Sequence, residues 1–314
     1  MLRRTQDQRV AILLSTFNGG LYLGAQLESL LNQTHEQWVL YWRDDGSSDV
    51  TREVMAEFTK RAGQGRCVEV PGPASNLGPA ASYYTLLREV SAGLATDDAV
   101  AFADQDDIWL PNKLERGVTA LNSVPRSKPA LYCARQILVD AGLNRLGESA
   151  TANGNIGFPA ALTQNVATGC TVMLNRQAAR LVAASTPPPS TMHDWWCYLV
   201  VTAAGGQLLH DAEPVVLYRQ HECNLVGAPA SRMARGLAAM RRGPRAFMSV
   251  LRQNVSALAA QPNLLTAQAR EELHELETAL RGGVLRRLRA LGIRGLTRQS
   301  WLETMVFRCW FILG

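Results

Sequence analysis

Val10-Ala-Ile-Leu-Leu-Ser15 is a continuous apolar run of strand length, and the leucines that follow at 23, 27, 30 and 31 share one helical face. Gln37-Trp-Val-Leu-Tyr-Trp-Arg43 is a second strand-like run, after which Val50, Val54 and Phe58 return to helical spacing. Apolar strands without alternation, separated by helices, indicate a parallel sheet covered on both faces. This stretch therefore predicts an α/β fold.

The same alternation continues toward the C-terminus. Further strands are expected over 67–70, 98–103, 131–139, 169–174 and 215–219. Further helices are expected over 80–90, 176–184 and 193–204. We expect the later elements to complete the same sheet and to build an acceptor face.

Composition is that of a globular protein with a large core. The chain has 314 residues, of which 47% are hydrophobic and 19% charged, too apolar for a disordered protein. No apolar run reaches the roughly 18 residues that cross a bilayer. The polar residues 1–9 lead into a short apolar stretch without a small-residue cleavage site. We therefore expect a cytoplasmic protein.

The six cysteines show no CxxC pair, which favours reduced, mostly buried thiols.

Charge divides the chain into two parts. Residues 1–227 hold 18 Lys/Arg against 22 Asp/Glu, whereas residues 228–314 hold 14 Arg against 5 Glu. We place a boundary near residue 228, between a catalytic domain over 1–227 and a basic, Arg-rich helical extension over 228–314. Within that extension, Gly282-Gly283 is the clearest break.

Two acidic loops each follow an apolar strand. The first carries Asp44 and Asp45, and the second carries Asp104, Asp106 and Asp107. Ligands of parallel sheets bind at the carboxyl ends of strands, and clustered carboxylates need a counter-charge that Mg²⁺ or Mn²⁺ supplies most simply. The alternative is a pair of solvated turns with helix caps, since Asp and Ser favour both positions.

Other phosphate-handling and hydrolytic motifs are absent from the sequence. It has no G-x-x-x-x-G-K-[ST], no G-x-G-x-x-G after the first strand and no G-x-S-x-G elbow. The chemistry is therefore expected to depend on carboxylates and a metal ion.

Eight motifs then occur in a fixed order. They are Ser15-Thr-Phe-Asn18, Asn32-Gln-Thr34, Arg43-Asp-Asp-Gly-Ser-Ser-Asp-Val-Thr51, Asn76-Leu-Gly78, Ala103-Asp-Gln-Asp-Asp-Ile-Trp109, Thr168-Gly169, His193-Asp-Trp-Trp196 and Tyr218-Arg-Gln-His221. With these motifs, the chain closely resembles the family 2 inverting glycosyltransferases of the GT-A fold. Within that family it is similar to the bacterial rhamnosyltransferase-like branch, over about residues 9–227.

The resemblance implies a nucleotide-diphospho-sugar transferase fold of the GT-A type, with a mostly parallel central sheet, helices on both faces and a C-terminal helical extension. It also implies a role for each matching residue. Asp194 is the expected catalytic base, Asp106 and His221 are the expected metal ligands, and His193 and Trp195 are expected to contact the acceptor or the sugar. Asp107 is expected to act as an additional or outer ligand of the metal. The expected contacts of the nucleotide sugar are Thr16, Asn18, Asp44, Asp45, Asn76, Gly78 and Asp104.

The activity implied is inverting transfer of a sugar, with dTDP-rhamnose the leading donor, to a hydroxyl of a cell-surface polysaccharide or a polyprenyl-linked oligosaccharide. The cofactor implied is Mg²⁺ or Mn²⁺. One alternative is a non-catalytic sugar-nucleotide-binding or scaffold protein of a polysaccharide assembly complex. Another is a nucleotidyltransferase, although Ser15-Thr-Phe-Asn-Gly-Gly20 lacks the basic residue that such an enzyme normally carries in its first loop.

The C-terminal extension has three interpretations. Its arginines and its late aromatic residues, Trp301, Phe307, Trp310 and Phe311, suit contact with an anionic membrane surface. That contact would place the protein on the inner face of the plasma membrane. Packing or oligomerisation is the structural alternative. Nucleic-acid binding by the arginines is disfavoured, because the preceding domain is expected to act on lipid-linked sugars.

Overall fold

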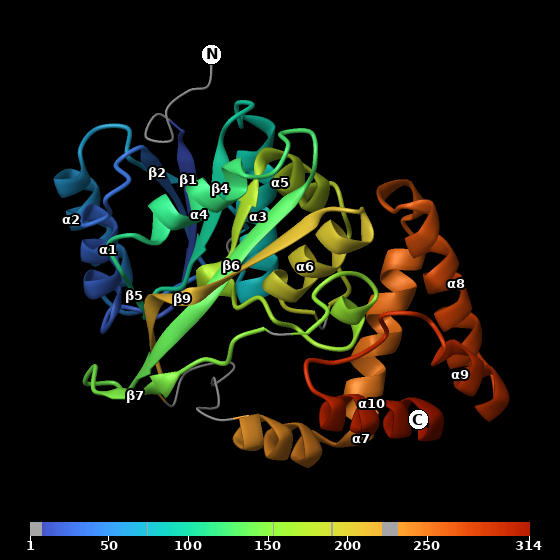
Figure 1. The fold of residues 1–314 in the computed structure, drawn as a ribbon. Helices are drawn as coiled ribbons and strands as arrows, with labels where there is room; N and C mark the ends of the chain where they lie inside the picture. The colour runs from blue at the N-terminus through green and yellow to red at the C-terminus, as the bar shows by residue number, and fades with distance from the viewer. Residues whose placement is uncertain (1–7, 74, 153, 190, 222–231) are drawn as a thin grey trace.

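A computed structural model describes residues 8–73, 75–152, 154–189, 191–221 and 232–314, with only the backbone over 232–242. In these residues one nine-stranded sheet runs through the molecule in the order β3-β2-β1-β4-β8-β6-β9-β5, and β7 pairs with β6 (Figure 1). The chain is an α/β protein with a curled, mixed sheet, helices on both faces and a group of C-terminal helices beside it.

The first half of the sheet is parallel, as the sequence predicts. Its elements are β1 (Val10–Thr16), α1 (Leu23–Leu31), β2 (Trp38–Asp44), α2 (Thr51–Ala62), β3 (Cys67–Glu69), α3 (Pro79–Ala92) and β4 (Ala99–Ala103). β1 pairs in parallel with β2 on one side and with β4 on the other. The carboxyl ends of these three strands therefore lie at one edge of the sheet.

Alternate residues of β1 enter two different cores. Ala11 and Leu13 pack in the core that includes α3, α5 (Arg176–Ala183) and α6 (His193–Ala203). Val10, Ile12 and Leu14 pack in the core that includes α1, α2 and α4 (Lys113–Asn122). Because successive side chains of a strand point to opposite faces, a fully apolar strand requires helices on both sides.

The residues expected to share one face of the second helix do not all lie within it. Val50 precedes α2 and is 58% exposed, and Val54 is only partly buried. The buried side chains of α2 are instead Thr51, Met55, Phe58 and Ala62. The spacing of Val50, Val54 and Phe58 is helical, but the loop before α2 leaves its first member in solvent.

The second half of the sheet mixes strand directions. It contains β5 (Ile108–Trp109), β6 (Ala130–Val139), β7 (Arg145–Glu148), β8 (Met173–Asn175) and β9 (Gln207–Arg219). β8 runs antiparallel to both β4 and β6. The strand expected over 169–174 is a 3₁₀ turn over 169–171 followed by β8, and the strand expected over 215–219 begins earlier, at Gln207. The elements α4, β5 and β7 were not predicted.

The C-terminal helices pack on the rest of the chain. They are α7 (Arg232–Ala259), α8 (Ala267–Arg281), α9 (Val284–Ala290) and α10 (Trp301–Leu313), and Gly282-Gly283 separates α8 from α9 as expected. Leu251, Leu276 and Phe307 belong to the same buried cluster as Leu13 of β1. The predicted boundary near residue 228 lies outside the described residues. In the part of the chain that is described, no helix is both long and apolar enough to span a bilayer.

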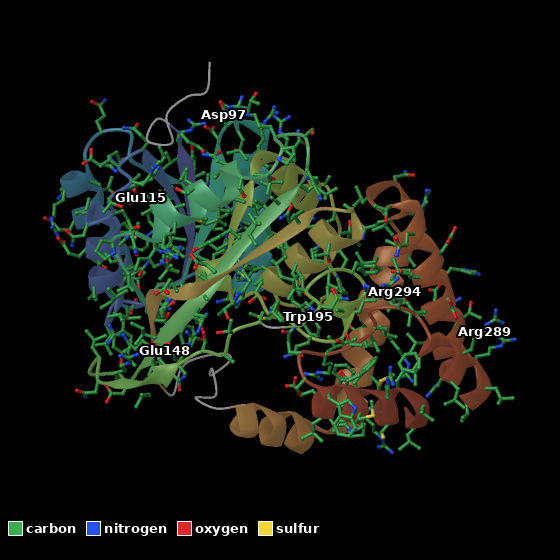
Figure 2. All side chains as sticks on the ribbon, viewed as in Figure 1. Asp97, Glu115, Glu148, Trp195, Arg289 and Arg294 are labelled. Carbon is green, nitrogen blue, oxygen red and sulfur yellow. The ribbon has the colours of Figure 1, made fainter. Side chains whose placement is uncertain are left out.

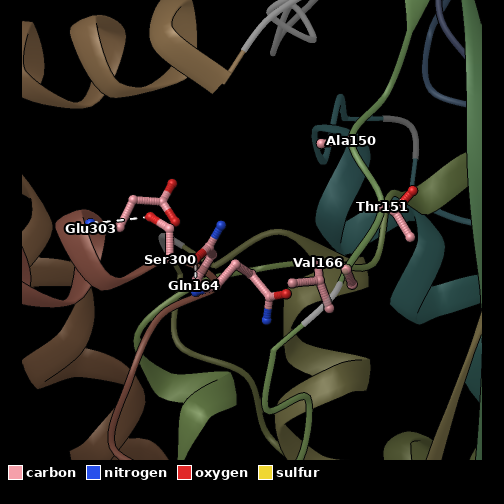
Figure 3. Close-up of a pocket in the computed structure, with 8 residues that line it drawn as sticks. Ala150, Thr151, Gln164, Val166, Ser300 and Glu303 are labelled. Atoms are coloured by element: carbon pink, nitrogen blue, oxygen red, sulfur yellow. Dashed lines mark hydrogen bonds between the residues drawn. The ribbon is translucent and has the colours of Figure 1, made fainter.

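A small pocket marks the seam between these helices and the sheet domain (Figure 3). Gln164 and Val166 line it from one side, and Gln299, Ser300 and Glu303 line it from the other. Ser300 caps α10 by accepting a hydrogen bond of 3.2 Å from the Glu303 backbone N–H. Hydrogen bonds between the Gln299 and Gln164 segments hold this seam together.

Candidate active site

Two acidic loops and the start of α6 meet near the carboxyl ends of β1, β2 and β4. Thr16 at the end of β1 is in register with Asp44, and Leu14 is in register with Ala103. The first acidic loop (residues 44–49) and the second acidic loop (residues 104–107) therefore flank the end of β1 on opposite sides. The sequence predicts this convergence.

Asp44 is enclosed by hydrogen-bond donors. It accepts hydrogen bonds from Thr16 Oγ1 at 3.0 Å, from Ser47 Oγ at 2.6 Å and from Ser47 N at 3.0 Å, with Arg52 Nη1 3.5 Å away. Burial raises the pKa of this carboxyl, but the bonds from Ser47 and Thr16 and the charge of Arg52 outweigh it, so the pKa lies below its usual value. Asp44 is thus held as a carboxylate.

Asp45 is paired even more completely. Arg43 Nη1 lies 2.5 Å from Asp45 Oδ1, and each of the two side chains is 2% exposed. The Gly78 backbone N–H donates to Asp45 Oδ2 at 2.8 Å, and the Leu77 N–H also donates to this carboxylate. The Gly78 N–H also donates a hydrogen bond of 2.9 Å to Asn76 Oδ1. Asp45 therefore anchors the Asn76–Gly78 turn to the end of β2.

Asn18 ties the loop after β1 to the first acidic loop. Its φ is 47°, in the left-handed region that asparagine tolerates. Its backbone N–H donates to Ser47 Oγ at 2.9 Å, and its Oδ1 accepts from Ser48 N at 2.9 Å. The preceding residue, Phe17, is 47% exposed and offers an open aromatic surface. Gln105 exchanges two hydrogen bonds with the Phe17 backbone, which joins this loop to the second acidic loop.

The second acidic loop is electrostatically strained. Burial and then the charge of Asp106 raise the pKa of Asp104 to about 7, although the hydrogen bond from Tyr83 lowers it. Burial and the neighbouring carboxylates also raise the pKa of Asp107 well above its usual value. Like charges in a buried site disfavour each other's ionised forms. Unlike Arg43 in the first loop, Arg219 contacts this loop through its backbone N–H, which donates to Asp107 Oδ1, and through its Nε, which donates to the Asp106 carbonyl oxygen.

The residues present fit a divalent cation. Oxygen atoms of Asp104 and Asp107 and the sulfur of Cys170 lie within 4.8 Å of one another. Asp107 is fully buried, and its Oδ2 has no hydrogen-bond partner among the described residues. Carboxylates are the ligands that Mg²⁺ and Mn²⁺ prefer. Lys113, also fully buried, carries the nearby positive charge, and burial lowers its pKa to about 7.

The two predicted metal ligands, Asp106 and His221, lie side by side. His221 Nε2 is 2.9 Å from Asp106 Oδ2. The centroid of the His221 ring lies 4.9 Å from that of Tyr22, which precedes α1. The Arg219 guanidinium lies over the Tyr22 ring, 4.5 Å from its centroid. The end of β9 is thereby held against the second acidic loop.

Asp194 lies in the first turn of α6, where the helix dipole favours an acidic side chain. It is not the N-cap, which is Met192. Asp194 Oδ2 accepts a hydrogen bond of 3.0 Å from Gly169 N, and the Asn165 side chain also bonds to it. Burial nevertheless raises the pKa of Asp194 to about 6. The charge of Asp194 is among the influences that raise the pKa of Asp104, so the two carboxylates share one electrostatic environment.

His193 and Trp195 lie differently from the open contacts that the resemblance implies. His193 is 4% exposed, and neither of its ring nitrogens has a hydrogen-bond partner in the described part of the chain. Burial lowers its pKa to about 3, so the ring is neutral. Trp195 is half-buried, and its indole N–H donates to the Ala161 carbonyl at 2.8 Å. Their contact with sugar stays a prediction.

Sequence reasoning missed several residues that shape the site. They are Tyr22, Arg43, Tyr83, Gln105, Lys113 and Cys170. Arg43 and Gln105 stand inside the quoted motifs, so their position beside the acidic residues was a usable signal. Tyr83, Lys113 and Cys170 come from other segments, and only the tertiary fold brings them near the carboxylates.

Comparison with known proteins agrees with this architecture. The sequence profile of glycosyl transferase family 2 matches residues 11–177, just over half of the chain. The chain is 26% identical over 241 residues to the dTDP-rhamnosyl transferase RfbG of Shigella flexneri, which covers 69% of this chain and 75% of that protein. It is 31% identical over 115 residues to the UDP-Glc:alpha-D-GlcNAc-diphosphoundecaprenol beta-1,3-glucosyltransferase WfgD of Escherichia coli, which covers 37% of this chain and 42% of that protein.

A solved structure shares the fold. The Staphylococcus aureus protein TarS (residues 1–349, in complex with UDP-GlcNAc) superposes with a TM-score of 0.59 at 13% identity, over 91% of this chain and 80% of that one. The chain spans only 31% of the length of an uncharacterized glycosyltransferase of Nostoc to which it is 32% identical, and 42% of the length of WfgD.

Proposed function

The chain belongs to glycosyl transferase family 2, and from this premise we propose that it is a metal-dependent inverting glycosyltransferase. The observation that carries the proposal is the meeting of the two acidic loops at the sheet edge, with the carboxylate of Asp194 in the same electrostatic environment as the second loop. The first loop would bind the nucleoside, the second the diphosphate, and Asp194 would act on the acceptor.

Asp194 has the properties of a general base. A base works best when its pKa lies near the working pH, because it is then ionised and still basic. A pKa of about 6 meets this condition better than that of an ordinary aspartate. Asp194 would take the proton of the acceptor hydroxyl as that oxygen attacks the anomeric carbon. A single displacement from the face opposite the diphosphate gives inversion.

The donor would occupy the edge between the two loops. Thr16, Asn18, Asp44 and Asp45 form the hydrogen-bonded wall of the nucleoside side, and Phe17 adds an exposed ring that suits stacking. Asp106 and His221, which lie side by side, would hold Mg²⁺ or Mn²⁺, and Asp104 would be directed to the ribose. Asp107 groups with Asp104 and Cys170 rather than with this pair, so it would act as an outer carboxylate of the site. When bound, such an ion neutralises the charge of the departing nucleoside diphosphate.

Rhamnose and a lipid-linked acceptor are the proposed substrates. The name of RfbG supports dTDP-rhamnose as donor, and the name of WfgD supports a sugar linked to diphosphoundecaprenol as acceptor. The proposal thus names two substrate classes. The donor is a nucleoside-diphosphate hexose, and the acceptor is a polyprenyl-diphosphate saccharide. The non-catalytic alternative predicts donor binding without turnover.

The test combines binding and turnover. Thermal shift against dTDP-rhamnose, UDP-glucose, UDP-GlcNAc and GDP-mannose, each with Mn²⁺ and with EDTA, identifies the donor, because a ligand of the folded state raises its stability. Release of nucleoside diphosphate with a GlcNAc-diphosphopolyprenol acceptor then tests transfer. Asp194→Asn should retain the donor shift and lose at least about 10²-fold in rate. An Asp194→Asn variant as fast as wild type would remove Asp194 as the base, and donor binding without any turnover by wild type would favour the scaffold alternative.

We also place the proposed membrane contact on α9 and α10. Leu285 is 83% exposed and Trp301 75% exposed, and Val284, Leu288 and Leu302 are exposed beside them in the chain. Residues 278–302 contain six arginines and no acidic residue. Figure 2 shows Arg289 at the outer edge of the C-terminal helices, away from the sheet. Exposed apolar side chains among arginines suit an anionic leaflet.

Vesicle sedimentation tests this contact on the full chain. Binding to anionic vesicles should weaken as salt rises, because each arginine contributes about 1 kcal/mol of attraction that salt screens. Leu285→Ser with Leu288→Ser should reduce binding, whereas the matched change Leu146→Ser on β7, at a residue that is also exposed, should not. Equal binding to neutral and anionic vesicles at all salt concentrations would exclude the electrostatic contribution.

A further inference from the structure

Tyr83 of α3 stands between the two halves of the candidate site. Its hydroxyl lies 2.9 Å from Asp104 Oδ1 and 2.6 Å from the Ala103 carbonyl oxygen. Its ring lies against the imidazole of His193, with centroids 4.0 Å apart and planes 30° apart. The residue is 3% exposed. Tyr83 therefore contacts Asp104, on the donor side, through its hydroxyl. The face of its ring contacts His193, the residue before the proposed base.

His193 passes this contact on to Asp194 through packing. Its ring is enclosed by Tyr83 and, edge-on at 5.0 Å, by Phe102. A Cβ atom at Gly169 would come within 2.9 Å of His193 Nε2, so this glycine is in close contact with the ring. The N–H of the same Gly169 donates to Asp194 Oδ2. The position of the His193 ring therefore affects the position of the Gly169 N–H, which orients the Asp194 carboxylate by a hydrogen bond.

Packing rather than hydrogen bonding fixes the His193 ring. Neither ring nitrogen has a partner among the residues that the structure describes. Aromatic contacts of this kind contribute stability beyond that from the burial of apolar area. Removing the Tyr83 ring would leave His193, and with it the start of α6, less firmly placed.

We propose that Tyr83 is a positioning residue that links Asp104, on the donor side, to Asp194, the base. The inference rests on the proposed function. The hydroxyl and the ring have separate tasks: the hydroxyl holds Asp104 for the donor, and the ring holds His193 and the first turn of α6 for proton removal. The two tasks predict different kinetic signatures.

Three variants separate these tasks. In Tyr83→Phe the ring remains and the hydroxyl is lost, so the KM and the Kd of the donor should rise about tenfold, the scale of one hydrogen bond to a charged group, with kcat within about threefold of wild type. Tyr83→Leu should also lower kcat, by up to about tenfold, since the aromatic contact is lost. Tyr84→Phe is the matched control, because its buried hydroxyl has no partner in the described structure. That control should change neither constant.

The outcomes distinguish this inference from the proposed function. Recovery of kcat by the conservative Phe variant relative to Leu, at similar melting temperatures, supports a positioning role for the ring. An unchanged donor Kd in Tyr83→Phe, measured by calorimetry, overturns the inference even if Tyr83→Leu does not fold. If Asp194→Asn is inactive while all Tyr83 variants behave as wild type, only the inference fails. If wild type transfers no sugar with any donor, the proposed function fails.

Discussion

The two acidic loops look alike in sequence and differ in how their charge is balanced. Both lie at the end of a parallel strand: Asp44 is the last residue of β2, and Asp104 directly follows β4. In the first loop, Arg43 and Arg52 accompany Asp45 and Asp44, and the pKa of Asp44 is lowered. In the second loop the pKa values of Asp104 and Asp107 are raised by burial and by mutual repulsion.

This difference indicates which loop would hold the proposed cation. An argument from clustered carboxylates alone applies equally to both loops, and for the first loop it is wrong, since arginines already supply the counter-charge. The second loop has Lys113 buried nearby, but burial disfavours the charged form of that side chain. The second loop therefore contains carboxyl groups whose charged forms are disfavoured in the unliganded protein and which a bound cation would stabilise.

The largest effect is expected from replacing the proposed metal ligand Asp106 in the second loop. Asp106→Asn should lower turnover by at least about 10²-fold, the scale on which loss of one charge-stabilising group acts, and should weaken the Mn²⁺-dependent part of the donor thermal shift. Asp44→Asn is the comparison in the first loop. It should weaken donor binding and leave the Mn²⁺ dependence of the remaining activity unchanged. Full activity of Asp106→Asn in EDTA would contradict the metal assignment.

The free energy of unfolding should depend more on the first loop than on the second. Arg43→Met leaves Asp45 buried without its partner, so it should lower the free energy of unfolding by about 3–5 kcal/mol. Asp107→Asn removes a buried carboxyl whose charged form is already disfavoured, so at pH 4, where this carboxyl is protonated in the folded state, its effect should stay within about 1 kcal/mol, measured by urea unfolding without metal.

The pH dependence of this pair sharpens the test. The pKa of Asp107 is raised in the folded protein, so wild type loses stability as pH rises above about 4, where the unfolded chain releases the proton. Asp107→Asn lacks this loss, and its stability relative to wild type should therefore improve with rising pH. A relative stability that is constant between pH 4 and 7 would show that Asp107 ionises normally in the folded state.

The sequence predicted the parallel half of the fold because each element there has an unambiguous local pattern. β1 and β4 are buried on both faces and read as apolar runs, and α1 carries its leucines at helical spacing. The second half was less predictable. β5 has only two residues, and β7 pairs along the far part of β6, so neither leaves a periodic pattern.

The same distinction applies to the site. Residues inside the quoted motifs converge as expected, with Thr16 bonded to Asp44 and His221 to Asp106. The pKa of Asp104, by contrast, depends on burial, on the charge of Asp106 and on Tyr83, a residue distant in sequence that hydrogen-bonds to it. A motif specifies which carboxylates are present, whereas burial and neighbours decide which of them are charged.

The base should give a pH profile that an ordinary aspartate would not. With a pKa of about 6 in the free protein, Asp194 is protonated below that pH, and kcat/KM should fall about tenfold for each pH unit below it. An aspartate with an unperturbed pKa near 3.9 would keep the full kcat/KM down to about pH 5. A kcat/KM profile that stays flat from pH 7.5 to 5 would show that Asp194 is not a buried base in the free enzyme.

The smallest effect is expected at Arg52, the exposed counterpart of Arg43 in the first loop. Its side chain is 53% exposed, lies 3.5 Å from Asp44 and also bonds to the exposed Glu69. Solvent-exposed ion pairs contribute about 0–1 kcal/mol, because water screens them and because their side chains lose freedom when they pair. Arg52→Ala should therefore lower the free energy of unfolding by less than about 1 kcal/mol, and 0.5 M salt should reduce that difference further. The pKa of Asp44 should stay below its usual value in this variant, because Ser47 and Thr16 still donate to it. A loss as large as that of Arg43→Met would mean that Arg52 is buried in solution, and the contrast between the two arginines would then disappear.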